Sequence, residues 1–138
     1  MEPIRVSAVV IRDADGRVLT VRKRGTSMFM FPGGKPDPGE RPVDAAVREC
    51  LEELGVSISA DDLRAIGEFE AAAANESGRR VIADVFEHPY VEVAAPKAEI
   101  AEVSWRDLDD ETVAPLLRDA VFPFLLAGSA ELGEAGER

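Results

Sequence analysis

Short apolar runs alternate with polar turn residues in the first part of the chain. Residues 4–11 (IRVSAVVI) and 17–21 (RVLTV) are rich in β-branched side chains, which favours strands. The intervening segment 13–16 (DADG) has the composition of a tight turn. This pattern predicts a β-hairpin formed by the first two strands.

An apolar run at 28–31 (MFMF) leads into residues 32–39 (PGGKPDPG). Proline lacks a backbone N–H and fixes φ, and glycine is typical of turns. The second segment is therefore predicted to be a constrained loop without regular secondary structure.

The clearest helical period spans residues 42–54. Its apolar side chains recur at three- and four-residue spacing: Val43, Ala46, Val47, Cys50, Leu51 and Leu54. Gly55 follows at the position where glycine commonly ends a helix. We therefore expect an amphipathic helix that ends at Gly55.

Strand patterns return in the second half of the chain, at residues 65–73, 81–86 and 103–105, with a turn at 75–78.

A second amphipathic pattern covers residues 112–126, and Pro123 is expected to shorten or kink this helix. The tail from residue 128 onward is expected to fray. The pattern contains no internal repeat and no linker, so we expect a single domain over residues 1–138.

The chain carries 27 acidic and 16 basic residues, for a formal net charge of −11. This charge repels a phosphate backbone, so polymeric DNA or RNA is not an expected partner. A small polyphosphate remains compatible, because a bound divalent cation can invert the local electrostatics of an acidic site.

The composition also bears on the cellular compartment. No apolar run approaches the roughly 20 residues of a membrane span, and the amino terminus lacks a secretory signal pattern. A lone cysteine, Cys50, cannot form an internal disulfide. We therefore expect a soluble cytoplasmic protein without a membrane partner, either a monomer or a homodimer.

Three carboxylates, Glu49, Glu52 and Glu53, gather on one face of the predicted helix. Like charges at this spacing cost a few tenths of a kcal/mol each, and a divalent cation would compensate them. Magnesium prefers oxygen ligands and often completes its shell with substrate phosphates. The alternative is the solvated face of an ordinary acidic helix, which charge runs usually mark.

The preceding loop decides between these interpretations. Gly34, Glu40 and the segment 48–56 (RECLEELGV) match every fixed position of the Nudix box, with Cys50 as the one soft substitution. Seven specified positions match by chance with a probability on the order of 10⁻⁸. The chain thus resembles the Nudix hydrolase family over residues 34–56, and more loosely over nearly its whole length.

The resemblance implies a Nudix fold, an α/β/α sandwich around a mixed β-sheet. It also implies an enzyme that lets water attack a phosphorus of a nucleoside di- or triphosphate or a nucleoside diphosphate derivative. Mg²⁺ is the expected cofactor and Mn²⁺ a substitute, because bound cations stabilise the developing charge and activate water. The partner would be a small nucleotide.

The family's roles map onto box residues. Glu52 and Glu53 resemble the principal metal ligands, and Glu49 resembles a metal ligand or general base. Arg48 would hold a catalytic carboxylate in place, although an ordinary surface ion pair is its simpler interpretation. The resemblance thus implies a catalytic set of Glu49, Arg48 and Glu53 and a metal set of Glu49, Glu52, Glu53 and the carbonyl of Gly34. Glu40 adds an acid from the loop.

Signals outside the box are weaker. Relatives often place a mobile acidic ligand or base near the position of Glu99, with Glu102 as its neighbour. A basic cluster could contact substrate phosphates or serve surface solubility: Arg22, Lys23, Arg24 and Lys35. Phe29 and Phe31 either stack a base or belong to the core, and His88 is expected to have no chemical role.

Residues typical of particular Nudix subfamilies are mostly absent, so they argue against some substrates and do not identify one. Residues 71–74 are all alanine, without the proline of ADP-ribose relatives or the tyrosine of diadenosine-polyphosphate relatives. Residues 113–115 (VAP) lack the asparagine with which MutT-like relatives often read a purine. The short chain still resembles the compact MutT-like branch. The alternatives are a nucleotide-sugar or dinucleotide pyrophosphatase and a non-catalytic Nudix-fold binding module.

Overall fold

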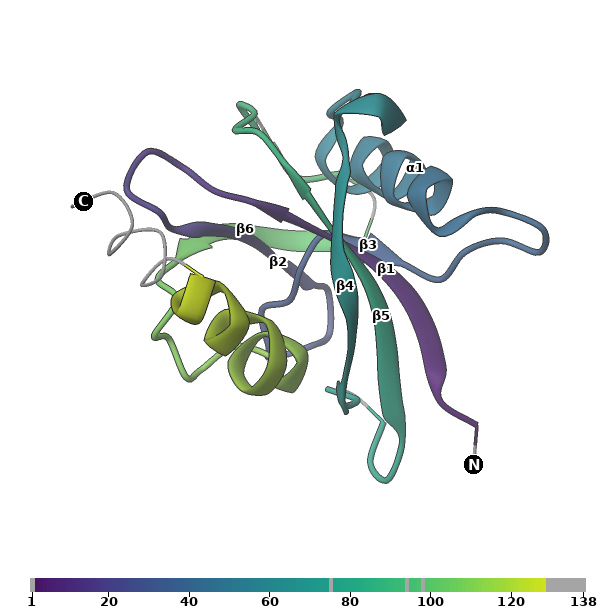
Figure 1. Ribbon diagram of the computed structural model, residues 1–138, viewed down its shortest axis with the longest axis vertical. Helices are drawn as coiled ribbons and strands as arrows, with labels where there is room; N and C mark the ends of the chain where they lie inside the picture. The colour runs from purple at the N-terminus through teal and green to yellow at the C-terminus, as the bar shows by residue number, and fades with distance from the viewer. Residues whose placement is uncertain (1, 75, 94, 98, 129–138) are drawn as a thin grey trace.

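The computed structural model describes residues 2–74, 76–93, 95–97 and 99–128 (Figure 1). Its elements follow in the order β1 (Ile4–Ile11), β2 (Val18–Lys23), β3 (Gly33–Gly34), α1 (Pro42–Leu54), the 3₁₀ turn η1 (Ala60–Asp62), β4 (Arg64–Ala72), β5 (Arg80–His88), β6 (Ile100–Arg106) and the π-helical segment η2 (Leu116–Val121). An α-helix continues from η2 over residues 122–128.

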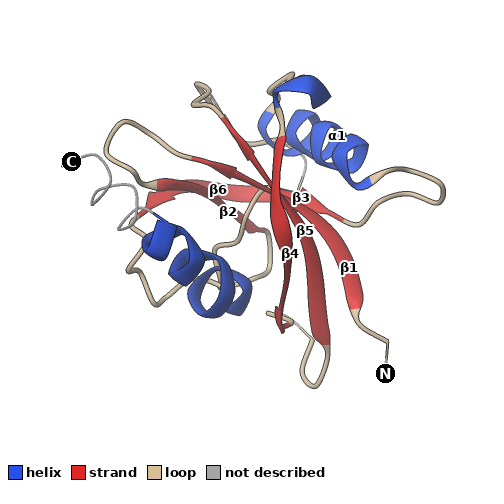
Figure 2. Cartoon of the chain, in the orientation of Figure 1, coloured by secondary structure: helices blue, strands red, loops and turns tan. Residues whose placement is uncertain are grey.

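The strands form two sheets (Figure 2). The larger has the order β3-β1-β5-β4, in which β1 and β5 are parallel and the other pairs antiparallel. The smaller pairs β2 with β6 in antiparallel fashion. The predicted mixed sheet is confirmed.

Alternate side chains of β1 face two different helical layers. Val9 and Ile11 share a hydrophobic cluster with Ala46 and Cys50 of α1. Ala8 and Val10 belong to a second cluster with residues of the C-terminal helix: Leu117, Val121, Phe122 and Leu125. The two helices accordingly lie on opposite sides of the strands in Figure 1. This is the predicted α/β/α sandwich.

The helix α1 has the predicted bounds. Pro42 occupies its first turn, where a missing N–H costs nothing, and Gly55 ends it in the left-handed region at φ 68°. The N–H of Gly55 donates to the carbonyl oxygen of Leu51 at 3.0 Å. Because Ala46, Cys50 and Leu54 face the sheet, the acidic residues lie on the remaining faces.

Two expectations about the first part of the chain are wrong. The turn after β1 exists, and Arg12 bridges Val18, but β1 and β2 do not form the predicted hairpin. Both edges of β1 are occupied by β3 and β5, so β2 pairs with β6 instead. The Pro- and Gly-rich loop also contains a strand, since Gly33 and Gly34 pair with β1. A side chain at Gly33 would overlap the carbonyl oxygen of Ser7, and glycine permits this close pairing.

The later elements follow the prediction with shifted bounds. Three strands are confirmed as β4, β5 and β6, each differing from its predicted range by up to three residues per end. The second helix begins at residue 115 rather than 112, and its π-helical segment ends at Val121, two residues before Pro123, after which the helix continues to residue 128. Residues 129–138 of the expected frayed tail lie outside the described residues. None of the described helices has the length and apolar character needed to cross a membrane.

Candidate active site

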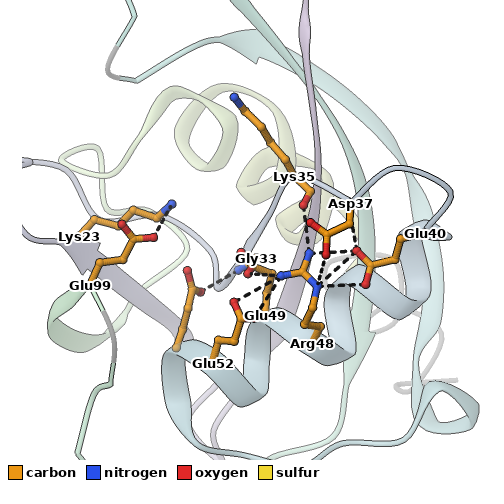
Figure 3. Close-up of polar contacts among 10 residues, drawn as sticks. Lys23, Gly33, Lys35, Asp37, Glu40, Arg48, Glu49, Glu52 and Glu99 are labelled. Atoms are coloured by element: carbon orange, nitrogen blue, oxygen red, sulfur yellow. Dashed lines mark hydrogen bonds and ion pairs between the residues drawn. The ribbon is translucent and has the colours of Figure 1, made fainter.

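Arg48 lies at the centre of the polar face of α1 (Figure 3). Its Nε and Nη2 donate to the carboxylate of Glu40 at 3.0 and 2.9 Å. Nη1 donates to Glu49 Oε1 at 2.9 Å and to Glu52 Oε2 at 3.3 Å, and Nη2 donates to the carbonyl oxygen of Lys35 at 3.1 Å. The hydrogen bond with Glu40 raises the pKa of Arg48. One guanidinium therefore connects the loop to the helix carboxylates.

Glu40, the acid of the loop, is held in place by two hydrogen-bonding partners. Besides contacting Arg48, its Oε1 accepts a hydrogen bond from the backbone N–H of Asp37 at 2.9 Å. These hydrogen bonds lower the pKa of the Glu40 carboxyl group. The carboxylate of Asp37 lies 3.4 Å from Arg48 Nε. Sequence reasoning missed Asp37, because only the folded loop brings it to the guanidinium.

Glu53 is the most buried of the helix acids, with 3% of its surface exposed. Its Oε1 accepts a hydrogen bond from the backbone N–H of Gly33 at 3.0 Å. Burial raises the pKa of Glu53 to about 7, although the Gly33 hydrogen bond opposes the shift. A buried carboxylate with one N–H donor is short of positive charge.

Glu49 lies against the second glycine of β3. A Cβ at Gly34 would overlap Glu49 Oε2, so the missing side chain leaves room for this carboxylate. Burial raises the pKa of Glu49 to about 7, with a further increase from Glu52 and opposition from Arg48. Glu49 and Glu53 therefore flank the β3 glycines as two carboxylates with raised pKa values.

The third acid of the face, Glu52, is more peripheral, with 52% of its side chain exposed. In the described part of the chain, no three His, Cys, Asp or Glu side chains are arranged to hold a metal ion. Glu49 and Glu52 instead contact Arg48, and Glu53 contacts Gly33. The donor set nevertheless fits a hard cation, because it consists of carboxylate oxygens, and the buried Glu53 carboxylate is paired with a neutral N–H rather than with a cation among the described residues.

The predicted basic cluster separates in the structure. Arg22 is directed to Glu102 at 3.2 Å and to the carbonyl oxygen of Thr26 at 2.9 Å. Arg24 is exposed, and its backbone N–H donates to the carbonyl oxygen of Glu99 at 2.8 Å. Neither arginine is brought to the helix carboxylates by these contacts.

The lysines of the cluster lie closer to the carboxylates. Lys23 Nζ is 3.9 Å from the exposed carboxylate of Glu99, and both charges influence the pKa of Glu53, which Lys23 lowers and Glu99 raises. Lys35 extends from the loop beyond β3 (Figure 3). Val21 packs with α1, and side chains two residues apart on a strand lie on the same side. Strand alternation therefore places Lys23 on the side of β2 that faces α1.

A cavity of about 220 Å³ opens beside Gly33 and Gly34. Lys23 and Lys35 line it together with apolar side chains, which include Val6, Ala8, Met30, Phe31, Leu116 and Leu117. Phe31 is 4% exposed and Phe29 is 8% exposed, so both belong to the core, while Phe31 also reaches the cavity wall. His88 is buried at the end of β5, away from this cavity, and its Nδ1 lies 2.8 Å from the carbonyl oxygen of Pro89.

The arrangement joins an acid-rich helix, a glycine pair and an apolar cavity. The family model described as "NUDIX domain" matches residues 1–126. The chain belongs to this family. The family predicted from residues 34–56 is therefore confirmed over most of the chain.

Named relatives of this NUDIX domain protein agree with the assignment. A MutT-like protein of Streptomyces ambofaciens is 29% identical over 111 residues, which cover 80% of this chain and 67% of that protein. The CTP pyrophosphohydrolase of Escherichia coli (strain K12) is 34% identical over 86 residues, which cover 59% of this chain and 58% of the enzyme.

The similarity to NUDIX proteins extends to a solved structure. The crystal structure of a MutT protein from Methanosarcina mazei Go1 matches with a TM-score of 0.74 and 29% identity, covering 93% of this chain and 96% of that one. The predicted Nudix fold is confirmed.

Proposed function

We propose that this NUDIX protein hydrolyses the phosphoanhydride bond of a nucleoside di- or triphosphate, or of a nucleoside diphosphate derivative, with Mg²⁺ or Mn²⁺ as cofactor. One observation carries the proposal: the buried carboxylate of Glu53 and the partly buried carboxylate of Glu49 flank the β3 glycines beside an apolar cavity that two lysines line. Metal-assisted water attack on the phosphorus of a nucleotide uses such a combination of metal-binding oxygens and a place for the nucleotide.

The cation would be held by Glu49, Glu53 and the carbonyl of Gly34, with Glu52 from the exposed side of the helix. When bound, it supplies electrostatic stabilisation of the phosphoryl oxygens and a more nucleophilic water. Burial raises the pKa of both Glu49 and Glu53 to about 7, although Arg48 opposes the shift of Glu49, so a bound cation would stabilise the ionised form of both carboxylates.

The remaining residues position this machinery. Arg48 holds Glu49 and Glu40 through charge-assisted hydrogen bonds, so the helix acid and the loop acid keep a fixed relation. The carboxylate oxygens of Glu49 and Glu53 that do not bind the cation are the proposed acceptors of the proton of the attacking water. Glu99, which faces Lys23 from outside, is a proposed supporting acid.

Lys23 and Lys35 are the proposed contacts for the substrate phosphates, because both line the cavity beside β3. Arg22, predicted for the same role, already has Glu102 and a carbonyl oxygen as partners, and Arg24 has no described contact with the cavity. The relatives named MutT and CTP pyrophosphohydrolase support a compact nucleotide hydrolase. We propose a small nucleotide as substrate and the cytoplasm as location.

The test is phosphate and pyrophosphate release across a panel of nucleoside triphosphates, nucleoside diphosphates, nucleotide sugars, dinucleotides and a 5′-triphosphorylated RNA, with Mg²⁺, Mn²⁺ or chelator. Turnover of free nucleotides that disappears on chelation is the expected result. Glu53→Gln keeps the shape and a hydrogen-bond acceptor, and turnover should fall about a hundredfold or more. Glu70→Gln, which neutralises an exposed acid on β4, is the matched control and should leave turnover unchanged.

Undiminished turnover after exhaustive chelation would overturn the metal proposal. Preference for nucleotide sugars or dinucleotides would replace the substrate class by the pyrophosphatase alternative. Preference for the RNA would contradict the expectation that a net charge of −11 disfavours polymeric nucleic acid. Absence of turnover with every substrate would favour a binding module.

A further inference from the structure

We propose that Glu76 selects nucleotides whose base carries an exocyclic amino group over nucleotides that present a carbonyl at the same place. The inference rests on the proposed function, since it assigns the cavity beside β3 to the base of the substrate. Glu76 lies in the turn between β4 and β5, outside the Nudix box, and lines the same cavity as Gly34 and Lys35.

The register of β1 defines two ends of this cavity. At one end Ser7 pairs with Gly34, next to the helix carboxylates. At the other end Ile4 pairs with Val81, at the start of β5 where the turn that carries Glu76 closes. Three residues of a strand rise about 10 Å, so the ends are separate along β1. A nucleotide with its phosphates at the β3 end would direct its base toward the other end.

The size and lining of the cavity suit a base. Its volume of about 220 Å³ lies below the several hundred Å³ of sites that enclose drug-sized ligands, so it holds one ring system rather than a whole nucleotide. Phe31, Val6 and Leu117 provide apolar walls. These walls bind any base and do not distinguish one from another.

Few side chains of the cavity can read the edge of a base. Among the described lining residues, those with polar side chains are Ser7, Lys23, Lys35 and Glu76. The hydroxyl of Ser7 donates to the carbonyl oxygen of Pro42 at 2.7 Å, and the proposed contacts of both lysines are phosphates. Glu76 remains as the group available to the far edge of the base.

The Glu76 carboxylate is oriented by Arg79 and can still accept further hydrogen bonds. Its Oε2 accepts from Arg79 Nη1 at 3.0 Å, and Arg79 is fixed in turn by a 2.8 Å hydrogen bond to the carbonyl oxygen of Glu2. A carboxylate offers about four acceptor positions and no donor, so further N–H groups can bind. With 47% of its side chain exposed, Glu76 lies at the cavity rim.

An acceptor without donors discriminates between amino and carbonyl edges. The N4 amino group of cytosine and the N6 amino group of adenine can donate to a carboxylate, and acidic side chains accept from cytosine N4 in nucleic-acid recognition. Uracil and thymine present O4 at that place, where two acceptors would face each other without a proton. The Glu76 carboxylate therefore favours the first group.

The decisive experiment compares kcat/KM for CTP and UTP, which differ in the group on C4, amino or carbonyl, and in the proton on N3. The parent should prefer CTP about tenfold, the effect of one partly exposed hydrogen bond to a charged group. Glu76→Gln should bring the ratio close to one, because the amide can both accept and donate. Glu70→Gln is the matched control: it also pairs with an arginine at 3.0 Å and is 52% exposed, and it should keep the parent ratio.

Equal kcat/KM for CTP and UTP in the parent, or an unchanged ratio in Glu76→Gln, would overturn the assignment of Glu76. A change in the ratio of CTP to dCTP with no change in CTP to UTP would mean that Glu76 reads the ribose, which also overturns it. Circular dichroism and thermal unfolding verify that the variant folds. Absence of metal-dependent turnover with every nucleotide would instead overturn the proposed function, and this inference with it.

Discussion

The Glu53 carboxylate accepts a hydrogen bond from the backbone N–H of Gly33 at 3.0 Å, with almost no exposure to solvent. This contact fixes the carboxyl-terminal turn of α1 to the two-residue strand β3. The proposed metal ligand Glu53 is thereby buried next to the sheet, where its ionised form costs stability. Such conflict between local stability and the chemistry of a site is expected at functional positions.

The first prediction concerns the stability of the metal-free protein as a function of pH. An unfolded glutamate has a pKa near 4.5, whereas burial raises the pKa of Glu53 and of Glu49 to about 7. Between these values the folded protein binds more protons than the unfolded chain. The free energy of unfolding should therefore decrease as pH rises from about 4.5 to about 7, and these groups should add no further change above that range.

Urea unfolding with chelator at pH 5 and pH 8 measures this effect. Glu53→Gln cannot ionise, so its free energy of unfolding should decrease less than that of the parent, by on the order of 2 kcal/mol. The exposed-acid variant Glu70→Gln should behave as the parent does. Parallel behaviour of Glu53→Gln and the parent would show that Glu53 ionises normally in the folded protein.

A second prediction tests the room that Gly34 leaves for Glu49. Gly34 has no positive φ, so alanine can adopt its backbone conformation, but the new Cβ would overlap the Glu49 carboxylate. Gly34→Ala should keep the fold while lowering kcat roughly a hundredfold, because a displaced acid loses its alignment. Gly128→Ala places a methyl group where no atom lies within 4 Å and should have parent-like kcat. If Gly34→Ala has the kcat of the parent, the position of the Glu49 carboxylate does not matter for the reaction.

Much of α1 could be predicted from the sequence, because its signals are local. The apolar period and Gly55 depend on neighbours within one or two turns, and the bounds agree with the structure. The box residues Arg48 and Glu40 were also identified, and the structure brings them into contact. Local patterns suffice where the helix itself sets the geometry.

Strand partners could not be predicted in the same way. The turn after β1 suggested a hairpin, yet the partners of β1 come from residues 33–34 and 80–88, which are distant in sequence. Strand pairing is decided by which edges remain free in the whole sheet. For the same reason the sequence did not distinguish Lys23 from its basic neighbours. Lys23 differs from Arg22 only through the position of β2 beside α1 in the folded protein.

A third prediction follows from the burial of Cys50. Its side chain is fully buried between α1 and the sheet, and burial raises the pKa of the thiol to about 12. The reactive thiolate is therefore scarce in the folded protein. Ellman's reagent should react negligibly with the native protein and should titrate one thiol in 6 M guanidinium chloride, since the chain has one cysteine. Rapid native reaction would mean that α1 opens readily from the sheet.

The last prediction asks whether Glu52 contributes to the metal site despite its exposure. In chelator, Glu52→Gln removes repulsion from Glu49 but also the 3.3 Å pair with Arg48. These opposing effects should leave the free energy of unfolding within about 0.5 kcal/mol of the parent value. Millimolar Mg²⁺ should then raise the melting temperature of the parent more than that of the variant, because a ligand that binds more tightly stabilises the folded state more at the same concentration. Thermal unfolding of both proteins with chelator and with Mg²⁺ gives the four melting temperatures required. Equal Mg²⁺-induced shifts would remove Glu52 from the ligand set and leave it a solvated residue of α1.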